Sequence, residues 1–493
     1  MSLPDLIEIV PLGKPVRAEI TVPGSKSITN RALILAALAD GEVTLQGALW
    51  SEDTQIMVEC LQELGFMVNV APDPDEICNR IITVYGDGGR VPPGGTESQP
   101  MELFAGNAGT AARFLSAFVC LGSGVYRLHG VPRMHERPQA ALFKALRELG
   151  YRVDSPNDKL PAVIFGGSSR GNEAQTSKTD QSLLTSAATK ERKCTVSIEE
   201  SSQFASALLL CAKTGGWEVK VVGENAEESP YVAMTSKMVE VFPHGGGKFQ
   251  IEPDASSGSY FWAAGALERG EKVHQAGEIP CRLSVSVVHW PISDWQIDRH
   301  FPFVMFGIAL NSPGYGSPAF DEIAEKFGSD WMKNQAVAAA LLNEMMPLNI
   351  SRQSDLADSI MTAIAMAPMT SGKNIFTHLG RLRVQETERV IALRTELTKC
   401  GAKVVEEGDT LTVYPSSLHG AEIETYNDHR MAMCFAVLGL KVPGIKIRNP
   451  ACVKKTFPNF FQKLAALPPH GLGATILDAK TGRKLENDEL FAD

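Results

Sequence analysis

The feature that most constrains this chain is a helix–strand segment that occurs six times along it. In each occurrence, a helix-like apolar stretch ends at small residues and runs directly into a short strand rich in β-branched residues. Three occurrences lie in each half of the chain, at residues 25–47, 107–130, 201–223, 254–277, 356–380 and 427–450. A repeat of this kind predicts that the fold is built from copies of one α/β unit.

A second unit, a helix closed by glycine and followed by a strand, comes after several of these segments. Its clearest copies are CLQELGFMVNV, ALRELGYRVDS and ELTKCGAKVVEE. Gly65, Gly150 and Gly401 stand where a helix C-terminus needs a positive φ, which glycine adopts without steric cost. Together the units describe a β-α-β-α-β-β module repeated about six times. Since 493 residues are too many for one ordinary core, the sequence predicts a two-domain α/β protein with internal pseudo-symmetry.

Two segments do not fit the repeat. Residues 166–193 are polar and nearly aperiodic, which predicts a mobile surface insertion. The stretch from about residue 468 to residue 493 follows the final module, and we expect it to form a peripheral tail. Neither segment is expected to carry catalysis.

Charge and composition narrow the class of protein. The formal net charge of -10 argues against nucleic acid or an anionic membrane as the main partner. No apolar run approaches the ~20 residues that a membrane span needs, and the first ten residues lack the zones of a signal peptide. The nine cysteines form no C-x-x-C pair, so we expect reduced and mostly buried thiols. These features predict a cytoplasmic protein.

The first turns of the repeated helices carry more charge than helix capping explains. Ser, Asn, Asp and Gly at these starts are interpreted first as N-caps. Lys26, Arg31, Gln203 and Arg430, however, crowd the same turns. Unpaired N–H groups and the helix dipole already favour anions there, so added cations would be repelled unless an anion arrived. If the pseudo-symmetry points several helix starts at one cleft, the ligand is small and carries several negative charges.

Nine motifs in a fixed order carry a resemblance to a known family. They are PGSKSITNRALILAAL, GNAGTAARFL, GVPRMHERP, ESSQFASALLL, SPYVAMT, EPDASSGSYF, RVQETER, TYNDHRMAMCFAV and KKTFPNFF. In this order the chain resembles the 5-enolpyruvylshikimate-3-phosphate synthase family of enolpyruvyl transferases, from about residue 7 to about residue 467. The resemblance implies an α/β, two-lobed fold, an inside-out α/β barrel in which each lobe is a pseudo-three-fold set of modules. Lobe one would be residues 24–252 and lobe two residues 1–23 plus 253–493, with the active site in the cleft between them.

The resemblance also implies a reaction. The family transfers the enolpyruvyl group of phosphoenolpyruvate to the 5-hydroxyl of shikimate 3-phosphate and releases phosphate, a step of the shikimate pathway toward the aromatic amino acids. Both substrates carry a carboxylate and a phosphate, which matches the anion-binding character of the helix starts. We therefore expect an enzyme without cofactor or metal that acts on two small molecules. We also expect a stand-alone monomer.

The family's motifs assign roles to particular residues of this chain. As catalytic residues they imply Lys26, Asp358 and Glu386, with Glu386 moving the proton of the methylene carbon and Asp358 that of the hydroxyl. Contacts to shikimate 3-phosphate would come from Lys26, Ser27, Arg31, Ser201, Ser202, Gln203, Tyr231, Asp358, Arg381 and Gln385. Contacts to phosphoenolpyruvate would come from Lys26, Gly109, Arg137, Gln203, Arg389, Arg430 and Lys455. Arginine suits the forked contacts that carboxylate and phosphate groups offer.

Four positions depart from the family's pattern. Gln385 stands where the family usually has lysine, and Arg381 stands where Asn or His is commoner, so Arg381 is a candidate for restoring the missing charge. Glu228 occupies the place of an expected serine, which leaves Ser229 as a substitute or Glu228 turned away. Phe114 replaces a common proline and is expected to alter the glycine loop before it, and with it the fit of the family's inhibitor glyphosate.

Two other functions stay open at this point. One is the related enzyme that acts on UDP-N-acetylglucosamine. Against it stand Ser27, where that family has asparagine, and the lack of a candidate loop cysteine near Arg137. The other is a non-catalytic binding protein of the same fold, which only Gln385 and Glu228 support. The presence of the predicted catalytic residues favours an active synthase.

Overall fold

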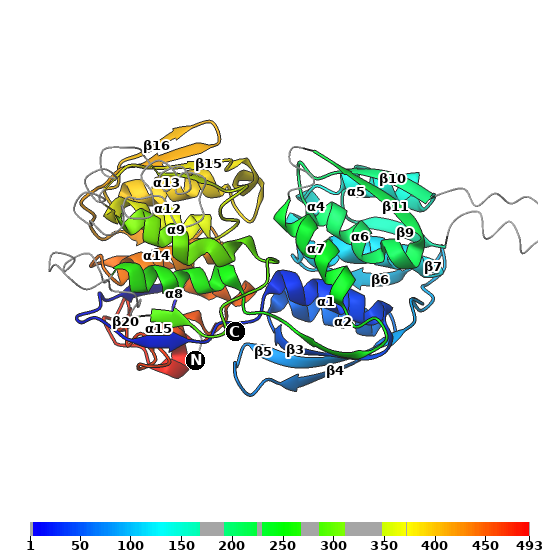
Figure 1. The fold of residues 1–493 in the computed structure, drawn as a ribbon, viewed down its shortest axis with the longest axis horizontal. Coiled ribbons are helices and arrows are strands. Elements are labelled where there is room, and N and C mark those ends of the chain that lie inside the picture. The colour runs from blue at the N-terminus through cyan, green and yellow to red at the C-terminus, as the bar shows by residue number, and fades with distance from the viewer. Residues whose placement is uncertain are drawn as a thin grey trace, which may run out of the picture. The chain divides into compact units, whose positions relative to one another are not determined.

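The computed structural model describes residues 3–167, 192–223, 229–267, 285–310, 348–370 and 372–492. The chain forms two compact units: unit 1 comprises residues 1–23 and 253–493, and unit 2 comprises residues 24–252. Both termini belong to unit 1 (Figure 1). Most of the predicted insertion at 166–193 lies outside the described residues, as does Glu228. In the described ranges, no helix has both the length and the apolar character needed to cross a membrane.

Unit 2 is an alternation of helices and strands that follows the repeat in the sequence. Its helices are α1 (Lys26–Leu38), α2 (Glu52–Glu63), α3 (Gly109–Phe118), α4 (Pro132–Glu136), α5 (Ala140–Glu148), α6 (Gln203–Gly215) and α7 (Pro230–Val241). Its strands are β3 (Asp40–Leu49), β4 (Met67–Pro72), β5 (Asn79–Asp87), β6 (Met101–Phe104), β7 (Gly124–His129), β8 (Arg152–Asp154), β9 (Ala162–Gly166), β10 (Arg192–Ser197), β11 (Trp217–Val222) and β12 (Gly247–Gln250).

Unit 1 follows the same alternation. Its α-helices are α8 (Ala255–Leu267), α9 (Phe301–Leu310), α12 (Ile360–Met366), α13 (Arg389–Lys399), α14 (His429–Gly439) and α15 (Phe460–Ala465). Short 3-10 helices include η3 (Ile297–His300), η6 (Gly380–Val384), η7 (Pro450–Lys455) and η8 (Asn487–Leu490). Its strands are β1 (Leu6–Ile9), β2 (Ala18–Ile20), β13 (Val285–Val287), β14 (Leu348–Ser351), β15 (Asn374–Thr377), β16 (Val404–Glu407), β17 (Thr410–Val413), β18 (Glu422–Ile423), β19 (Ile445–Arg448) and β20 (Ile476–Asp478).

Four sheets share one topology, in which a parallel pair is extended by two antiparallel strands. Their strand orders are β12-β3-β5-β4, β6-β7-β9-β8, β14-β15-β17-β16 and β18-β19-β1-β20. Two further parallel pairs, β10-β11 and β13-β2, have the first half of this topology. In the part of the chain that is described, each unit therefore holds three sheets that begin with a parallel pair, as three copies of one module require.

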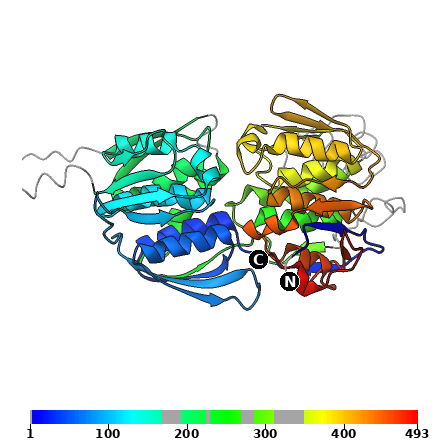
Figure 2. The same ribbon diagram turned by 180° about the vertical axis from the view of Figure 1, so that it is seen from behind.

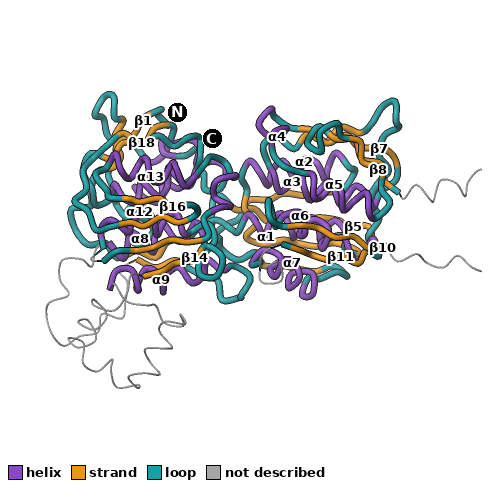
Figure 3. The backbone as a smooth tube through the Cα atoms, turned by 90° about the horizontal axis from the view of Figure 1, so that it is seen from above, coloured by secondary structure: helices purple, strands orange, loops and turns teal. Residues whose placement is uncertain are grey.

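The repeated helices form the centre of each unit. In unit 2, α1, α3 and α6 pack on one another, and in unit 1, α8, α12 and α14 do so. Every residue of α3, α12 and α14 is buried, which explains why these segments lack a polar face. Strands such as β1 and β17 alternate buried and more exposed residues, as strands with one outer face do. Figure 3 shows the helices, in purple, layered with the strands, in orange, within each unit.

Two smaller sequence predictions are confirmed. Gly65, Gly150 and Gly401 have φ values of +95°, +93° and +90°, so each closes its helix in the conformation that favours glycine. The cysteines in the described ranges are free and buried.

The C-terminal stretch corrects one expectation. Residues from 468 onward do not form a peripheral tail, because β20 pairs antiparallel with β1 and completes a sheet of unit 1. Leu472, Ile476, Leu485 and Leu490 are all at most 2% exposed and belong to the hydrophobic core of that unit. Figure 2 shows the first strand, in dark blue, beside the orange and red C-terminal elements. The free edge of β1 and the apolar residues of this stretch give it a partner that its position after the last module does not reveal.

We expect Leu490→Ala to destabilise unit 1. Leu490 is fully buried, so the substitution leaves a cavity, and such changes cost about 2–5 kcal/mol of unfolding free energy. Leu467→Ala is the matched control, since that side chain is 80% exposed. Thermal melting of both variants checks the prediction, and equal melting temperatures would show that the C-terminal stretch is not part of the core.

Candidate functional site

In unit 2, the first turns of α3 and α6 are joined by the side chain of Gln203. Its Nε2 donates to Oγ1 of Thr110 at 3.1 Å, and its Oε1 accepts from Nη1 of Arg113 at 2.5 Å. Ser201 lies beside it and accepts a hydrogen bond from the Gln203 N–H at 3.3 Å, while Ser202 is buried. The predicted residues of these two helix starts therefore lie together.

Gly109 and Arg137, which the motifs assign to one substrate, are in close contact. Nη1 of Arg137 donates to the backbone oxygen of Asn107 at 3.2 Å, which holds the guanidinium over the start of α3. A Cβ atom added at Gly109 would lie 2.6 Å from Nη1 and 2.7 Å from Cζ of Arg137. Only glycine leaves room for the arginine in this place.

Lys26, the first residue of α1, is paired with a residue that the sequence reasoning missed. Its Nζ lies 3.1 Å from Oδ2 of Asp53, in the first turn of α2, and the Asp53 side chain is only 5% exposed. An acid in the first turn of a helix is an ordinary dipole partner, so Asp53 gave no functional signal in the sequence. The contact fixes the position of the predicted catalytic lysine.

The starts of three central helices of unit 2 are not capped as the residue types suggested. Ser25, Ala108 and Ser202 occupy the N-cap positions of α1, α3 and α6, and none makes a side-chain cap hydrogen bond within the described residues. The capping interpretation is therefore wrong for these helices. The first-turn N–H groups of α1 and α3 are available to an anion, since a helix start without a side-chain cap favours one, whereas in α6 the Gln203 N–H donates to Oγ of Ser201.

Arg31 lies behind these starts and holds three helices together. Its Nε donates to Oγ1 of Thr235 at 2.8 Å, Nη1 to the backbone oxygen of Ser27 at 2.8 Å, and Nη2 to Oγ of Ser206 at 2.9 Å. The residue is 2% exposed, and burial lowers the pKa of its guanidinium to about 10. Arg31 is thus deeply buried among neutral partners from α1, α6 and α7.

Aromatic rings enclose the Arg31 guanidinium. Its Cζ lies 5.4 Å from the ring centre of Phe114 and 6.0 Å from that of Tyr231, within the range of cation–π contacts. Phe114, one of the four departures, is fully buried. Its position in this cluster gives it a role in packing α3 against α1.

In unit 1, Asp358 lies between two arginines. Nη2 of Arg430 is 3.1 Å from Oδ2, and Nη2 of Arg352 is 3.1 Å from Oδ1. Burial by itself raises the pKa of the Asp358 carboxyl, but Arg430 and Arg352 lower it by more, so it lies well below its usual range. Asp358 is therefore ionised and a weak base as long as both arginines stay in place.

Glu386 has the same arrangement. Its Oε2 lies 2.7 Å from Nη2 of Arg389, and its Oε1 lies 3.1 Å from Nζ of Lys455 in η7. Glu386 is thus in direct contact with Arg389, one helical turn away, and with Lys455, which is 69 residues away in the sequence. Each of the two predicted proton-transfer residues of unit 1 is held by two cations.

Arg389 is fixed by an acid that the sequence reasoning did not use. Its Nε lies 2.7 Å from Oδ2 of Asp428 and its Nη2 lies 3.2 Å from Oδ1, a forked contact. Nη1 of Arg389 donates to Oε1 of Gln385, a contact that a lysine in place of Gln385 could not accept. Burial lowers the pKa of Arg389, but Asp428 and Glu386 raise it by more. The guanidinium, 1% exposed, positions Glu386 and Gln385 together.

The loop before α14 is strained at the point where it delivers Arg430. Tyr426 and Asn427 have φ values of +54° and +56°, a conformation that non-glycine residues rarely adopt and that clusters at functional sites. Asp428 then caps α14 by accepting from the Arg430 N–H at 2.9 Å. The hydroxyl of Tyr426 donates to the buried Glu396 at 2.7 Å, which stabilises the loop.

Asp298 joins the starts of α8 and α12. Its Oδ2 accepts from Oγ of Ser256, and its Oδ1 accepts from the N–H of Ala357 and from the N–H and Oγ of Ser359. Burial raises the pKa of this carboxyl, although the hydrogen bonds from Ser256 and Ser359 lower it. These contacts fix the backbone on both sides of Asp358.

Arg383 and Arg381, in the same charged stretch, have different surroundings. Arg383 is ion-paired with Glu388, Glu406 and Asp409, so it stabilises the fold of η6 and its neighbours. Arg381 lies half-buried in η6, and its role as a substitute for the missing lysine stays a prediction.

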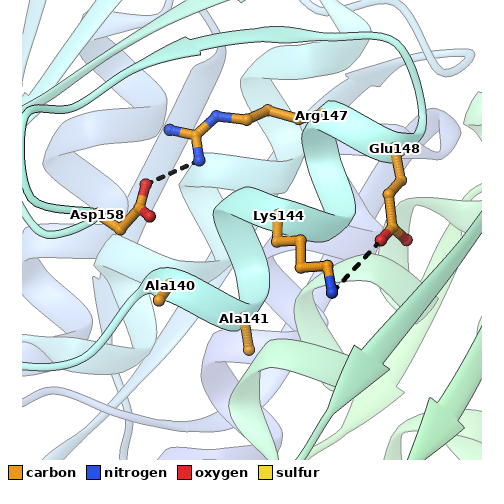
Figure 4. A pocket seen from close by; sticks show the side chains of 6 residues that line it. All are labelled: Ala140, Ala141, Lys144, Arg147, Glu148 and Asp158. Carbon is orange, nitrogen blue, oxygen red and sulfur yellow. Dashed lines mark hydrogen bonds and ion pairs between the residues drawn. The ribbon is translucent and has the colours of Figure 1, made fainter.

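A surface hollow of about 570 Å³ lies elsewhere in unit 2. It is lined by Ala140, Ala141, Lys144, Arg147, Glu148 and Asp158 (Figure 4). Its charged side chains are paired with one another, Arg147 with Asp158 at 2.7 Å and Lys144 with Glu148 at 4.0 Å. None of the predicted site residues lines it, so the helix starts are the better candidate site.

Comparison with known proteins shows which family the chain belongs to. A sequence profile described as "EPSP synthase (3-phosphoshikimate 1-carboxyvinyltransferase)" matches residues 10–244 and 310–464. The 3-phosphoshikimate 1-carboxyvinyltransferase of Trichormus variabilis is 34% identical over 481 residues, which cover 93% of this chain and 98% of the relative. The chain belongs to the EPSP synthase family. The enzyme of the same name from Opitutus terrae is 34% identical over 496 residues, covering 95% of this chain and 98% of the relative. The resemblance carried by the nine motifs is confirmed.

Solved structures bear on the fold of this family member. EPSP synthase from Acinetobacter baumannii has a TM-score of 0.61 at 20% identity and covers 93% of this chain and 97% of that one. The enolpyruvyl transferase NikO from Streptomyces tendae has a TM-score of 0.59 at 14% identity, covering 98% and 99%. The predicted two-lobed α/β enolpyruvyl transferase fold is confirmed.

The low pKa of Asp358 predicts a pH-dependent contribution to stability. A carboxyl whose pKa is depressed in the folded state stabilises the protein above its unfolded pKa of about 4, and that stability is lost as the pH falls. We expect the fall in unfolding free energy between pH 6 and pH 3 to be smaller in Asp358→Asn than in the wild type, by about 1 kcal/mol. Urea unfolding of the two proteins at both pH values measures this. An identical fall would mean that the two arginines do not hold the carboxylate.

Proposed function

We propose that this chain transfers the enolpyruvyl group of phosphoenolpyruvate to the 5-hydroxyl of shikimate 3-phosphate and releases phosphate. As an enzyme of the EPSP synthase family, it acts in the shikimate pathway of aromatic amino acid biosynthesis. The observation that carries the mechanism is the pair of carboxylates in unit 1. Asp358 and Glu386 each contact two cations, and an anionic substrate competes for these cations.

The reaction needs two proton movements on the way to an adduct. The hydroxyl oxygen bonds to the enol carbon, its proton leaves to a base, and the C=C electron pair takes a proton at the methylene carbon. The C–O bond to phosphate then breaks with its electron pair, and the new methyl group gives back one proton. Asp358 is the base for the hydroxyl, and Glu386 is first the acid and then the base at carbon.

The cations couple substrate binding to these proton movements. When Arg430 turns to the carboxylate or phosphate of phosphoenolpyruvate, Asp358 loses one of the groups that make it a weak base. When Lys455 turns to the same substrate, and Arg389, still held by Asp428, shares its charge with it, the negative charge of Glu386 is less stabilised, which favours uptake of a proton. The catalytic groups thus become competent only when the anions are bound.

Residues of unit 2 supply the other contacts. Lys26, Arg137 and the uncapped starts of α1, α3 and α6 offer positive charge and N–H donors, while Ser27, Ser201, Ser202 and Gln203 offer neutral donors. Arg31, Tyr231, Arg381 and Gln385 are assigned to shikimate 3-phosphate. These assignments follow from the family's motifs. We also propose that the protein acts in the cytoplasm as a monomer.

Family membership favours this reaction over the two alternatives. NikO, a different enolpyruvyl transferase, has a similar fold. The fold alone therefore does not show which acceptor substrate is used. The relatives at 34% identity are 3-phosphoshikimate 1-carboxyvinyltransferases. Phosphate release from phosphoenolpyruvate, measured with shikimate 3-phosphate or with UDP-N-acetylglucosamine as acceptor, tests the proposal. Turnover with the second acceptor, or with neither, would contradict it.

Glu386→Gln should abolish turnover while substrate binding is retained. The amide keeps the size of the side chain but cannot give or take the carbon proton, and loss of a general acid or base costs about 10²–10⁴-fold in rate. Phosphate-release kinetics and calorimetry with each substrate measure the two effects. Glu102→Gln, at an exposed ion pair of unit 2, is the control. A variant with near-normal kcat would show that Glu386 does not move the proton.

Gly109→Ala should raise the KM for phosphoenolpyruvate by about tenfold with a smaller effect on kcat. The new methyl group would displace the Arg137 guanidinium, whose contact with a carboxylate or phosphate is worth about 1.5–3 kcal/mol. Gly245→Ala is the matched control, because no atom lies within 4 Å of a Cβ added there. Kinetics with each substrate varied in turn check this. An unchanged KM would place the phosphoenolpyruvate contact elsewhere.

A further inference from the structure

Arg352 contacts the proposed hydroxyl base but lies in none of the nine motifs. Its Nη2 is 3.1 Å from Oδ1 of Asp358, and its side chain is 9% exposed. Arg430 is 3.1 Å from the other oxygen, Oδ2. Each arginine therefore has one carboxylate oxygen to itself.

The backbone of Arg352 is fixed. The residue follows β14, and its N–H donates to the backbone oxygen of Thr377 at the end of β15, at 3.1 Å. The preceding Ser351 accepts from the Gln353 N–H through its Oγ at 3.0 Å, and its own N–H donates to Asp355 at 2.7 Å. The guanidinium thus projects from an ordered turn.

One hydrogen-bond donor of the Arg352 side chain is not used in the part of the chain that is described. Its Nε is buried and finds no hydrogen-bond partner within the described residues. Burying an unsatisfied donor destabilises the folded protein. Arg31, in contrast, uses all three of its nitrogens on protein oxygens. Arg352 therefore keeps its contact with Asp358 although its Nε donor is left unsatisfied within the described residues.

The backbone of Asp358 is also fixed, because Asp298 accepts hydrogen bonds from the N–H groups of Ala357 and Ser359, at 2.7 and 3.3 Å. With the backbone held on both sides, the direction of the carboxylate depends on its two arginines. If Arg430 leaves for a substrate, Arg352 alone keeps the carboxylate in place.

We propose that Arg352 is a positioning residue for Asp358: it holds Oδ1 while Oδ2 changes partner from Arg430 to the substrate hydroxyl. This inference rests on the function proposed above. The hydroxyl proton moves to Oδ2, and the electron pair of the O–H bond stays on oxygen to form the new C–O bond. Arg352 acts through Asp358 and does not touch the substrate.

The pH dependence follows from the charged groups around Asp358. These are Arg352 in the turn after β14, Arg430 on α14, Arg389 on α13, Glu386 in the turn before α13 and Asp298 in η3. The three cations lower the pKa of the Asp358 carboxyl and Glu386 raises it, while Asp358 itself raises the pKa of Asp298. Removal of Arg352 therefore raises that pKa, and the acidic limb of the rate profile moves to higher pH.

The experiment compares Arg352→Gln and Arg352→Lys with the wild type. We expect Arg352→Gln to lower kcat by about tenfold or more, to leave both KM values within about threefold, and to shift the acidic limb of kcat upward by about one pH unit. Arg352→Lys keeps the charge and should restore the wild-type limb and most of kcat. Arg147→Gln, which breaks a half-exposed ion pair on α5, is the control and should change neither.

Three results would overturn the proposal. A raised KM with unchanged kcat would make Arg352 a substrate-binding residue. A lower melting temperature and lower kcat with an unmoved acidic limb would leave it a structural role. Failure of Arg352→Lys to restore either quantity would show that charge at this position is not what matters.

A measurement without turnover separates this inference from the proposed function. Aspartate labelled with 13C at the carboxyl carbon reports the titration of Asp358, whose signal is identified by its loss in Asp358→Asn. We expect this titration to move to higher pH in Arg352→Gln. If the wild type shows no turnover, the proposed function fails even if the titration moves. If the wild type turns over and the titration does not move, only the role of Arg352 fails.

Discussion

A helix that is buried on all sides still has unpaired N–H groups at its start, and this constraint shapes the whole molecule. The central helices of each unit are buried and largely apolar, and polar side chains that they carry, such as Arg31 and Arg430, are paired with other protein groups. At α1, α3 and α6 the N-cap residues make no side-chain cap hydrogen bond within the described ranges. The starts of α3 and α6, which the Gln203 side chain joins, therefore favour negative charge.

Carboxylates of the protein pair with cations that are predicted to bind the substrates. Lys26 is paired with Asp53, Arg430 with Asp358, and Lys455 with Glu386. Because these groups are largely buried, removal of one partner of such a pair is costly. The same contacts that stabilise the folded chain hold the proposed proton-transfer groups in a state of low reactivity. Under the proposed function, substrate anions exchange for the carboxylates, so that binding and activation are one event.

Much of the candidate site could be predicted because its residues lie in local motifs. The stretch RVQETER places Glu386 three residues before Arg389, which is one helical turn, and the two side chains are in contact. Asp53, Arg352, Asp298 and Asp428 were missed for a common reason. Each is an acid or arginine whose local role, such as a helix cap or an ordinary surface charge, explains it without reference to a distant partner. Their partners are defined by packing between elements.

Sequence by itself determined the repeated module, the central helices and the glycines that close α2, α5 and α13, and it predicts an anionic ligand. These follow from periodicity and from the types of residue within a few turns, which are short-range properties. Tertiary structure decided what the C-terminal stretch and Phe114 pack against, how deeply Arg31 is buried, and which acid neutralises each cation. Those outcomes depend on strand pairing and on side chains brought together across the chain, such as Lys455 and Glu386, 69 residues apart. Local sequence patterns do not predict such contacts.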